Sequence, residues 1–121
     1  MAALRIVVVA DTETDRVRLE RICSDAGYDV IETTSGTQAL DSVSEEKPDL
    51  VLLDVVMDEM GGFRICRELS NSTDTREIPV IMLNDKEQKV DKLWAQQQGA
   101  KGLITKPYSP EEVLAQIRRF I

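Results

Sequence analysis

The 121-residue sequence contains no histidine, and this absence excludes much of the usual chemistry. Histidine is the commonest general base in enzymes and the commonest protein ligand of transition metals. Cysteine is also scarce, since Cys23 and Cys66 are the only two, and each falls in an apolar helical pattern with no motif around it. We therefore expect two buried free thiols, consistent with a reducing cytoplasm, rather than a catalytic or disulfide role.

The sequence also lacks long apolar runs and any stripe of basic residues. No stretch reaches the roughly 18 consecutive apolar residues that a membrane-spanning helix needs, and the N-terminus lacks the pattern of a signal peptide. The formal net charge is −7, whereas a nucleic-acid-binding surface should be basic and clustered. We expect a cytoplasmic protein that neither inserts into a membrane nor binds nucleic acid.

Apolar and charged residues are present in the proportions of an ordinary domain. They make up 42% and 31% of the chain, and the length fits one domain over residues 1–121, without repeats or a linker. Short runs rich in Val, Ile and Leu are typical of strands that are buried on both faces of a parallel sheet. Short apolar runs occur at residues 4–9, 28–31, 50–53, 80–83 and 103–105, and three of them are nearly continuous in Val, Ile and Leu.

Amphipathic segments with helical spacing follow these runs. Their apolar stripes are Leu19, Ile22, Cys23 and Ala26; Ala39, Leu40 and Val43; Ile65, Cys66 and Leu69; Val90, Leu93 and Trp94; and Val113, Leu114, Ile117 and Ile121. Residues 109–112 (Ser-Pro-Glu-Glu) predict a helix start, Ser35 with Gln38 predicts a second capping box, and Gly27 and Gly99 mark helix ends. The strict alternation predicts an α/β fold, with a parallel sheet covered by helices on both faces.

Polar and charged residues close four of the five predicted strands. Asp11 follows the first strand, Asp54 the third, Asn84 and Asp85 the fourth, and Lys106 ends the fifth. In such sheets, ligands bind beyond the carboxyl ends of the strands, which share one edge. We therefore expect two carboxylates and a lysine to converge there, with an amide and a third carboxylate beside them.

This set of residues suits phosphoryl transfer to a carboxylate. Asp54 closes an apolar run and is costly to bury unless it is paired, while Asp11 nearby would repel it. Lys106 supplies one cation, and Mg²⁺, which prefers oxygen ligands, could supply another. Asp54 could then act as a nucleophile, with the metal and Lys106 offsetting the charge of the transferred group.

Each of these residues also has a purely structural interpretation. A lone aspartate at a strand end is usually a turn former or a helix cap, and Asp11 could cap the first helix with its own side chain. Lys106 and Pro107 could form a simple loop. The occurrence of all these residues along one sheet edge favours a functional site.

In these residues the chain resembles the receiver domains of two-component response regulators, of the chemotaxis-regulator type. The resemblance covers the whole chain and rests on residues 9–11 (Val-Ala-Asp), 54–62 (Asp-Val-Val-Met-Asp-Glu-Met-Gly-Gly), 99–100 (Gly-Ala) and 106–107 (Lys-Pro). It implies a single doubly wound, flavodoxin-like sheet of five parallel strands in the order 2-1-3-4-5, with five helices. Residues 85–100 also resemble regulators of type IV pilus twitching motility.

The resemblance implies a role for each residue at this sheet edge. Asp54 would be the phosphoacceptor, and Lys106 would contact the phosphoryl group. Mg²⁺ would be bound by Asp11, Asp54 and the backbone carbonyl of Val56. Asn84 stands where the family has a switch Ser or Thr, and it could donate a hydrogen bond to a phosphoryl oxygen. A histidine kinase would supply the phosphoryl group, and a downstream protein would bind the face of the fourth helix, fifth strand and fifth helix.

The chain departs from the family pattern near this site. Ala10 replaces the first of two acidic residues, Asn84 replaces a hydroxyl residue, and Asp85 replaces a small one. Leu103 stands at the position of the switch aromatic. Asn84 with Glu87, or Asp85 with Gln88, could instead cap the next helix. These changes motivate an alternative, which is a pseudo-receiver that acts as a binding module and is never phosphorylated.

Two further positions bear on the kind of function. Trp94 either packs at the edge of the fourth helix or anchors a protein partner. An aspartate-based phosphatase would need a second aspartate two residues after the nucleophile, and this chain has Val56 there. No glycine-rich phosphate loop follows the first strand. We therefore expect a signalling protein that catalyses only its own phosphorylation and dephosphorylation, rather than an enzyme.

Overall fold

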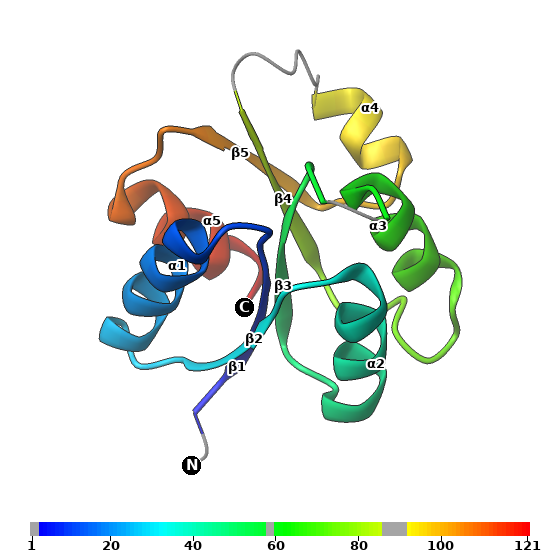
Figure 1. The fold of residues 1–121 in the computed structure, drawn as a ribbon, viewed down its shortest axis with the longest axis horizontal. Coiled ribbons are helices and arrows are strands. Elements are labelled where there is room, and N and C mark those ends of the chain that lie inside the picture. Colours follow the sequence, from blue (N-terminus) through cyan, green and yellow to red (C-terminus); the bar gives the residue numbers. More distant parts are fainter. Residues whose placement is uncertain (1–2, 58–59, 86–91) are drawn as a thin grey trace.

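Residues 3–57, 60–85 and 92–121 are described by the computed structural model, and they form a parallel sheet between two layers of helices (Figure 1). The strands are β1 (Arg5–Val9), β2 (Asp29–Thr33), β3 (Leu50–Asp54), β4 (Val80–Asp85) and β5 (Gly102–Lys106). The helices are α1 (Glu13–Asp25), α2 (Gly36–Glu46), α3 (Gly62–Asn71), α4 (Lys92–Gln97) and α5 (Pro110–Phe120). The strand order is β2-β1-β3-β4-β5 and every pairing is parallel, which confirms the predicted doubly wound fold.

Both faces of the sheet are covered by apolar layers. Helices α1 and α5 cover one face, and α2, α3 and α4 cover the other (Figure 1). Along β1, Ile6 and Val8 join the apolar cluster of the first face, while Val7 and Val9 join that of the second. All five residues of β3 are buried. Burial on both faces is the reason that these strands appear in the sequence as continuous apolar runs.

Helix α1 begins differently from one of the alternatives that the sequence offered. Its N-cap is Thr12, whose side chain accepts a hydrogen bond from the backbone N–H of Asp15. The prediction that Asp11 could cap this helix with its own side chain is therefore wrong, because the Thr12 hydroxyl takes the cap position. This leaves the Asp11 carboxylate outside the helix start, at the end of β1.

The two predicted capping boxes have different outcomes. The box at α5 is confirmed, since Ser109 and Glu112 exchange the expected side-chain and backbone hydrogen bonds. At α2, Ser35 caps the backbone N–H of Gln38 as predicted. The Gln38 side-chain oxygen, however, accepts from the backbone N–H of Thr34 at 2.9 Å. The predicted reciprocal box at α2 is therefore wrong, because the glutamine side chain reaches one residue beyond the cap.

The remaining local predictions concern glycines, thiols and one cap. Gly27 and Gly99 follow helices with φ values of 94° and 106°, in the left-handed region that glycine adopts without strain. Cys23 and Cys66 are free and buried, and burial raises the pKa of their thiols to about 12 and about 11. The predicted capping partners Glu87 and Gln88 lie outside the described residues.

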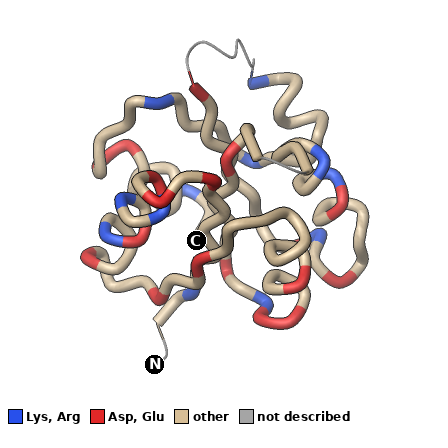
Figure 2. The backbone as a smooth tube through the Cα atoms, in the orientation of Figure 1, with Lys and Arg blue, Asp and Glu red and all other residues tan. Residues whose placement is uncertain are grey.

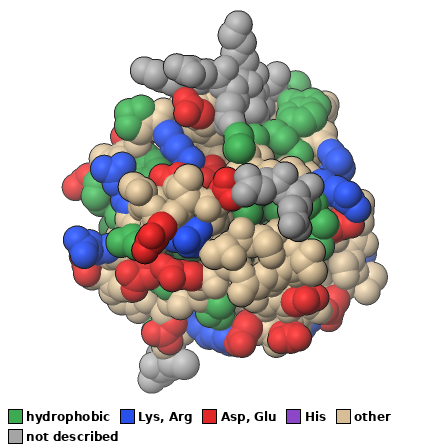
Figure 3. Space-filling view, viewed as in Figure 1, with side chains coloured by type: hydrophobic (Ala, Val, Ile, Leu, Met, Phe, Trp, Pro, Cys, Tyr) green, Lys and Arg blue, Asp and Glu red, His purple; other side chains and the backbone are tan. Residues whose placement is uncertain are grey.

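Acidic and basic residues are interspersed along the chain. Both kinds occur at many places along the backbone (Figure 2), and on the face in Figure 3 the Lys and Arg side chains form several small groups among acidic and uncharged ones. No helix of the described residues is both long enough and apolar enough to cross a membrane.

Candidate functional site

The carboxyl edge of the sheet brings Asp54 and Lys106 into contact. Asp54 ends β3 and is only 5% exposed, because strands and apolar side chains surround it. Lys106 ends β5, on the far side of β4, and its Nζ donates to Asp54 Oδ1 at 2.8 Å. The pair is thus made by residues from two strands that are not neighbours in the sheet.

Asp15 is a second carboxylate partner of the same lysine, and sequence reasoning missed it. It lies in the first turn of α1, and its Oδ2 accepts from Lys106 Nζ at 3.1 Å. The pattern Thr12-x-x-Asp15 gave a signal, but that signal predicts a helix cap and not a contact with Lys106. The side chain does lie beside the Thr12 hydroxyl, with Oγ1 and Oδ2 3.1 Å apart.

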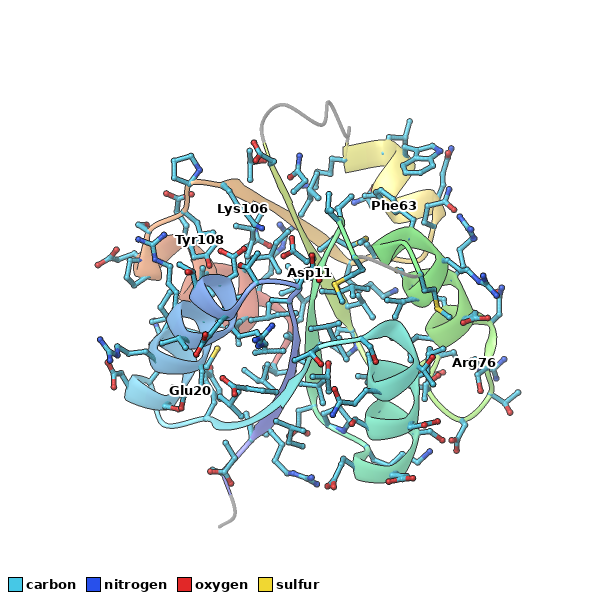
Figure 4. The ribbon with its side chains drawn as sticks, viewed as in Figure 1. Asp11, Glu20, Phe63, Arg76, Lys106 and Tyr108 are labelled. Atoms are coloured by element: carbon cyan, nitrogen blue, oxygen red, sulfur yellow. The ribbon has the colours of Figure 1, made fainter. Side chains whose placement is uncertain are left out.

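Asp11 completes the acidic surroundings of Asp54. It is half-buried in the loop between β1 and α1, at the same edge as Lys106 (Figure 4). The guanidinium of Arg16 donates to the backbone carbonyls of Ala10 and Asp11 at 3.1 and 3.0 Å, and these bonds hold the loop. The charge of Asp11 acts on Asp54, as the pKa of Asp54 shows.

The electrostatics of the site reflect several acids around one lysine. Burial raises the pKa of Asp54, the contact with Lys106 opposes this, and the charges of Asp15 and Asp11 add to the rise. For Lys106, burial lowers the pKa, but the bonds and charges of Asp54 and Asp15 outweigh it and leave the pKa raised. The site thus gathers three carboxyl groups around one lysine, a set that a further cation would balance.

Tyr108 lies two residues after Lys106 and was also not predicted from the sequence. It is buried, and burial together with the charge of Asp15 raises its pKa to about 12. The Arg18 guanidinium lies 5.7 Å from the centroid of its ring. Its hydroxyl has no hydrogen-bond partner among the residues that the structure describes. No sequence motif marks this tyrosine.

Asn84 is buried at the end of β4, where its amide is held by two neighbours. Its Oδ1 accepts from the Thr105 hydroxyl at 3.1 Å, and its Nδ2 donates to the backbone carbonyl of Asp85 at 3.2 Å. The pairing of Asn84 with Thr105 and of Asp85 with Lys106 places both residues at the same edge as Asp54. The side-chain hydroxyl at this edge thus comes from β5, through Thr105, rather than from β4.

The segment after Asp54 is shaped by a close backbone approach at Gly62. A Cβ on Gly62 would lie 2.1 Å from the carbonyl oxygen of Asp54, and the Gly62 N–H donates to the Val55 carbonyl at 2.9 Å. Only glycine fits there without displacing the strand end. The exposed Val56 lies two residues after Asp54, and its backbone is therefore just beyond the carboxyl end of β3.

The donor atoms at this edge fit a hard divalent cation. Two carboxylates, Asp11 and Asp54, and the backbone carbonyl of Val56 are all oxygen donors, and their excess negative charge favours a cation. No group of three or more acidic, cysteine or histidine side chains suited to a metal occurs within the described parts of the chain. Mg²⁺ is commonly bound by only one or two protein carboxylates, and water molecules complete its coordination shell.

A second feature of the surface lies at α4. Trp94 is 42% exposed and packs edge-on against Phe63 of α3, with ring centroids 4.2 Å apart and planes at 71°. Leu93 beside it is 66% exposed. Trp94 thus packs against a neighbouring helix, as one of its two interpretations predicts, and keeps part of its apolar surface exposed.

Comparison with known proteins gives one family. Residues 6–118 match the response regulator receiver domain. The chain is 36% identical over 113 residues to Protein PilH of Pseudomonas aeruginosa, which covers 93% of each protein. Chemotaxis protein CheY4 of Vibrio cholerae has a TM-score of 0.90 and 27% identity over 99% of this chain and 100% of CheY4.

A third similarity concerns the fold alone. The receiver domain of sensor histidine kinase PA1611 from Pseudomonas aeruginosa has a TM-score of 0.89 at 24% identity, over 98% of each chain, and its structure has magnesium coordinated in the active-site cleft. With the matched family model, the similarity to PilH and the sheet order of the structure, the chain belongs to the response regulator receiver domains of two-component systems.

Proposed function

We propose that this chain accepts a phosphoryl group from a histidine kinase on Asp54 and signals by binding another protein. The observation that supports this most is the buried Asp54 carboxylate in contact with Lys106, beside Asp11 and Asp15, at the ligand-binding edge of the sheet. Receiver domains in general work with histidine kinases and downstream proteins. The chain itself would act in the cytoplasm.

The chemical step is a displacement at phosphorus. A carboxylate oxygen of Asp54 attacks the phosphorus of a phosphohistidine, a P–O bond forms and the P–N bond breaks. The electron pair of the broken bond goes to the imidazole nitrogen of the kinase. Lys106 would donate a hydrogen bond to a phosphoryl oxygen and offset its charge, and the Asn84 amide could donate another.

Mg²⁺ would be held by Asp11, Asp54 and the backbone carbonyl of Val56. When bound, it offsets negative charge on the phosphoryl oxygens. Support for this assignment comes from the oxygen-only donor set and from the charges of Asp15 and Asp11, which add to the rise that burial causes in the pKa of Asp54. The magnesium in the cleft of the PA1611 receiver domain agrees with it.

The output partner would bind the face formed by α4, β5 and α5. The exposed parts of Trp94 and Leu93 would be anchors there, because tryptophan contributes strongly to binding at interfaces. Leu103 of β5 would couple the site to this face without an aromatic side chain. The similarity to PilH supports a role in type IV pilus motility, as the resemblance of residues 85–100 suggested.

The pseudo-receiver remains the second candidate, and one observation favours it. The Asn84 amide already has two partners, since its Oδ1 accepts from Thr105 and one of its two Nδ2 N–H groups donates to the Asp85 carbonyl, so a single N–H is left for a phosphoryl oxygen. In that case the domain would bind its partner without phosphate.

Intact mass after incubation with acetyl phosphate and Mg²⁺ separates the two candidates. The proposal predicts one phosphoryl adduct on the wild type and none on Asp54→Asn or in a sample with chelated metal. An absent adduct on folded wild-type protein would contradict the proposal and support the pseudo-receiver.

A further inference from the structure

Lys106 has two carboxylate partners, and the second one has no role in the function proposed above. The same Nζ donates to Asp54 Oδ1 at 2.8 Å and to Asp15 Oδ2 at 3.1 Å. We infer that Asp15 is a positioning residue, which holds the Lys106 ammonium between α1 and Asp54 so that its third N–H faces a phosphoryl group on Asp54. This inference rests on the proposed phosphorylation of Asp54.

Asp15 is well placed to act as a fixed point. Its backbone N–H donates to Thr12 Oγ1 at 3.2 Å, and its carboxylate lies 3.1 Å from the same hydroxyl. Both the backbone N–H and the carboxylate of Asp15 are therefore fixed within the first turn of α1. Lys106 has a long flexible stem, and a single contact with Asp54 would leave its ammonium free to move about that contact. A second anchor on a different element restricts this motion.

Helix capping does not account for this contact. An acidic residue at the third helical position normally turns back to the backbone N–H of the N-cap residue. Here Oδ2 of Asp15 is shared between the Thr12 hydroxyl and Lys106, which lies 91 residues further along the chain. Asp15 also acts on the centre of the site, because its charge contributes to the raised pKa of Asp54.

The contact also bears on the family difference at residue 10. Ala10 is buried and brings no carboxylate to the edge, and its carbonyl is used by Arg16. Asp15 brings a carboxylate to the same edge from one turn into α1. Lys106 thus keeps two acidic partners although β1 ends in one aspartate instead of two.

Asp15 has two opposing effects on the binding of a phosphoryl group at Asp54, and the larger of the two decides whether its removal weakens or strengthens binding. Its negative charge repels a phosphoryl group, which would weaken binding at Asp54. Its bond to Lys106 keeps the ammonium in place, which would strengthen binding. The ammonium lies between the two carboxylates at hydrogen-bond distance from both, so it screens the repulsion, and the positioning effect should dominate.

The test compares Asp15→Asn with Asp15→Glu and with Glu13→Gln. Glu13 is an exposed acid in the same first turn of α1, so Glu13→Gln removes the same charge without touching Lys106. One readout is the NMR signal of the Lys106 ammonium, which is observable when its protons are held in hydrogen bonds. The other is the affinity for beryllofluoride with Mg²⁺, a stable analogue of the phosphoryl group, titrated by amide shifts. Circular dichroism verifies that each variant is folded.

Asp15→Asn should lose the Lys106 ammonium signal and bind beryllofluoride roughly threefold to tenfold more weakly, between the effects of a surface ion pair and a buried charged hydrogen bond. Asp15→Glu should recover part of both, and Glu13→Gln should match the wild type. Equal or tighter binding by Asp15→Asn would overturn the inference, as would an equal loss in Glu13→Gln.

Failure of the proposed function gives a different pattern. In that case the wild type itself would not bind beryllofluoride, whereas the Lys106 signal of the metal-free protein would still be measurable. Loss of that signal in Asp15→Asn alone would support positioning by Asp15, and an unchanged signal would overturn it.

Discussion

The two ends of the sheet carry ion pairs of different kinds. At the amino end, Arg5 pairs with Glu46 and Lys47 pairs with Asp74, and these four side chains are 36% to 51% exposed. At the carboxyl end, one lysine serves two acids: the Lys106 and Asp15 side chains are 23% exposed and that of Asp54 is 7% exposed. At the amino end each cation thus has one acidic partner and lies in solvent. At the carboxyl end two acids surround one lysine, and all three side chains are largely shielded from solvent.

This difference shows where the molecule gives up stability for function. Exposed one-to-one pairs contribute about 0–1 kcal/mol each and are found anywhere on a surface. A buried acid beside other acids lowers the stability of the fold unless a cation balances its charge. Such clusters therefore occur mainly at functional sites. The raised pKa of Asp54 and the lowered pKa of Asp74 express the same contrast.

Gly62→Ala should give the largest effect at the carboxyl end. A methyl group there would lie 2.1 Å from the Asp54 carbonyl, so the strand end must shift, at a cost of about 3 kcal/mol in the free energy of unfolding. A Cβ on the adjacent Gly61 would have nothing within 4 Å, and because Gly61 is only the N-cap of α3, Gly61→Ala should cost no more than about 1 kcal/mol. Urea unfolding measures both, and similar losses would refute the tight packing around Asp54.

Replacing one lysine at each end tests the contrast in charge. Lys106→Met keeps the apolar stem but leaves the buried Asp54 without its cation, and it should cost about 2 kcal/mol at neutral pH. Lys47→Met breaks an exposed pair and should cost less than about 1 kcal/mol. The loss in Lys106→Met should shrink in acid, where Asp54 becomes neutral. If both variants lose equal stability by urea unfolding, the two ends do not differ as described.

Mg²⁺ should stabilise the protein through the carboxyl end alone. A ligand tenfold above its Kd raises the free energy of unfolding by about 1.4 kcal/mol. Asp11→Asn removes a proposed ligand and should lose most of this gain, whereas Glu46→Gln at the amino end should keep it. Unfolding with and without Mg²⁺ makes the comparison, with Ca²⁺-free buffer and matched ionic strength. A full gain in Asp11→Asn would place the cation elsewhere.

The smallest effects are pH dependences of opposite sign at the two ends. Burial and neighbouring acids raise the folded pKa of Asp54 above 3.8, so Asp54 contributes stability that is present below pH 3.8 and lost as the pH rises through the folded pKa. The hydrogen bonds of Lys47 and Ser44 lower the folded pKa of Asp74, so its contribution is present above pH 3.8 and lost as the pH falls through the folded value.

Relative to the wild type, Asp54→Asn should therefore gain stability as the pH rises above 3.8 through the raised folded pKa of Asp54, and Asp74→Asn should lose stability as the pH rises through the lowered folded pKa of Asp74. Urea unfolding at several pH values in metal-free buffer gives both trends. Parallel trends in the two variants would mean that Asp54 is not in an unfavourable charged environment.

The sequence allowed most of the fold and part of the site to be predicted. Nearly continuous runs of Val, Ile and Leu marked β1, β3 and β4, because burial on both faces leaves few polar positions, and Asp54 stood out because it closes such a run. Thr12-x-x-Asp15 indicated only a cap, since a local pattern carries no information about a lysine 91 residues away. Tyr108 could not be found, because its burial depends on how α1 packs beside α5.

The position of the phosphoryl group tests the central claim most directly. After phosphorylation with acetyl phosphate and Mg²⁺, borohydride reduces an aspartyl phosphate to homoserine, and peptide sequencing by mass spectrometry locates the change. The account predicts homoserine at residue 54 and nowhere else, and none when Asp54 is replaced by Asn. A change at Asp11 or Asp15, or no change in folded protein, would contradict it.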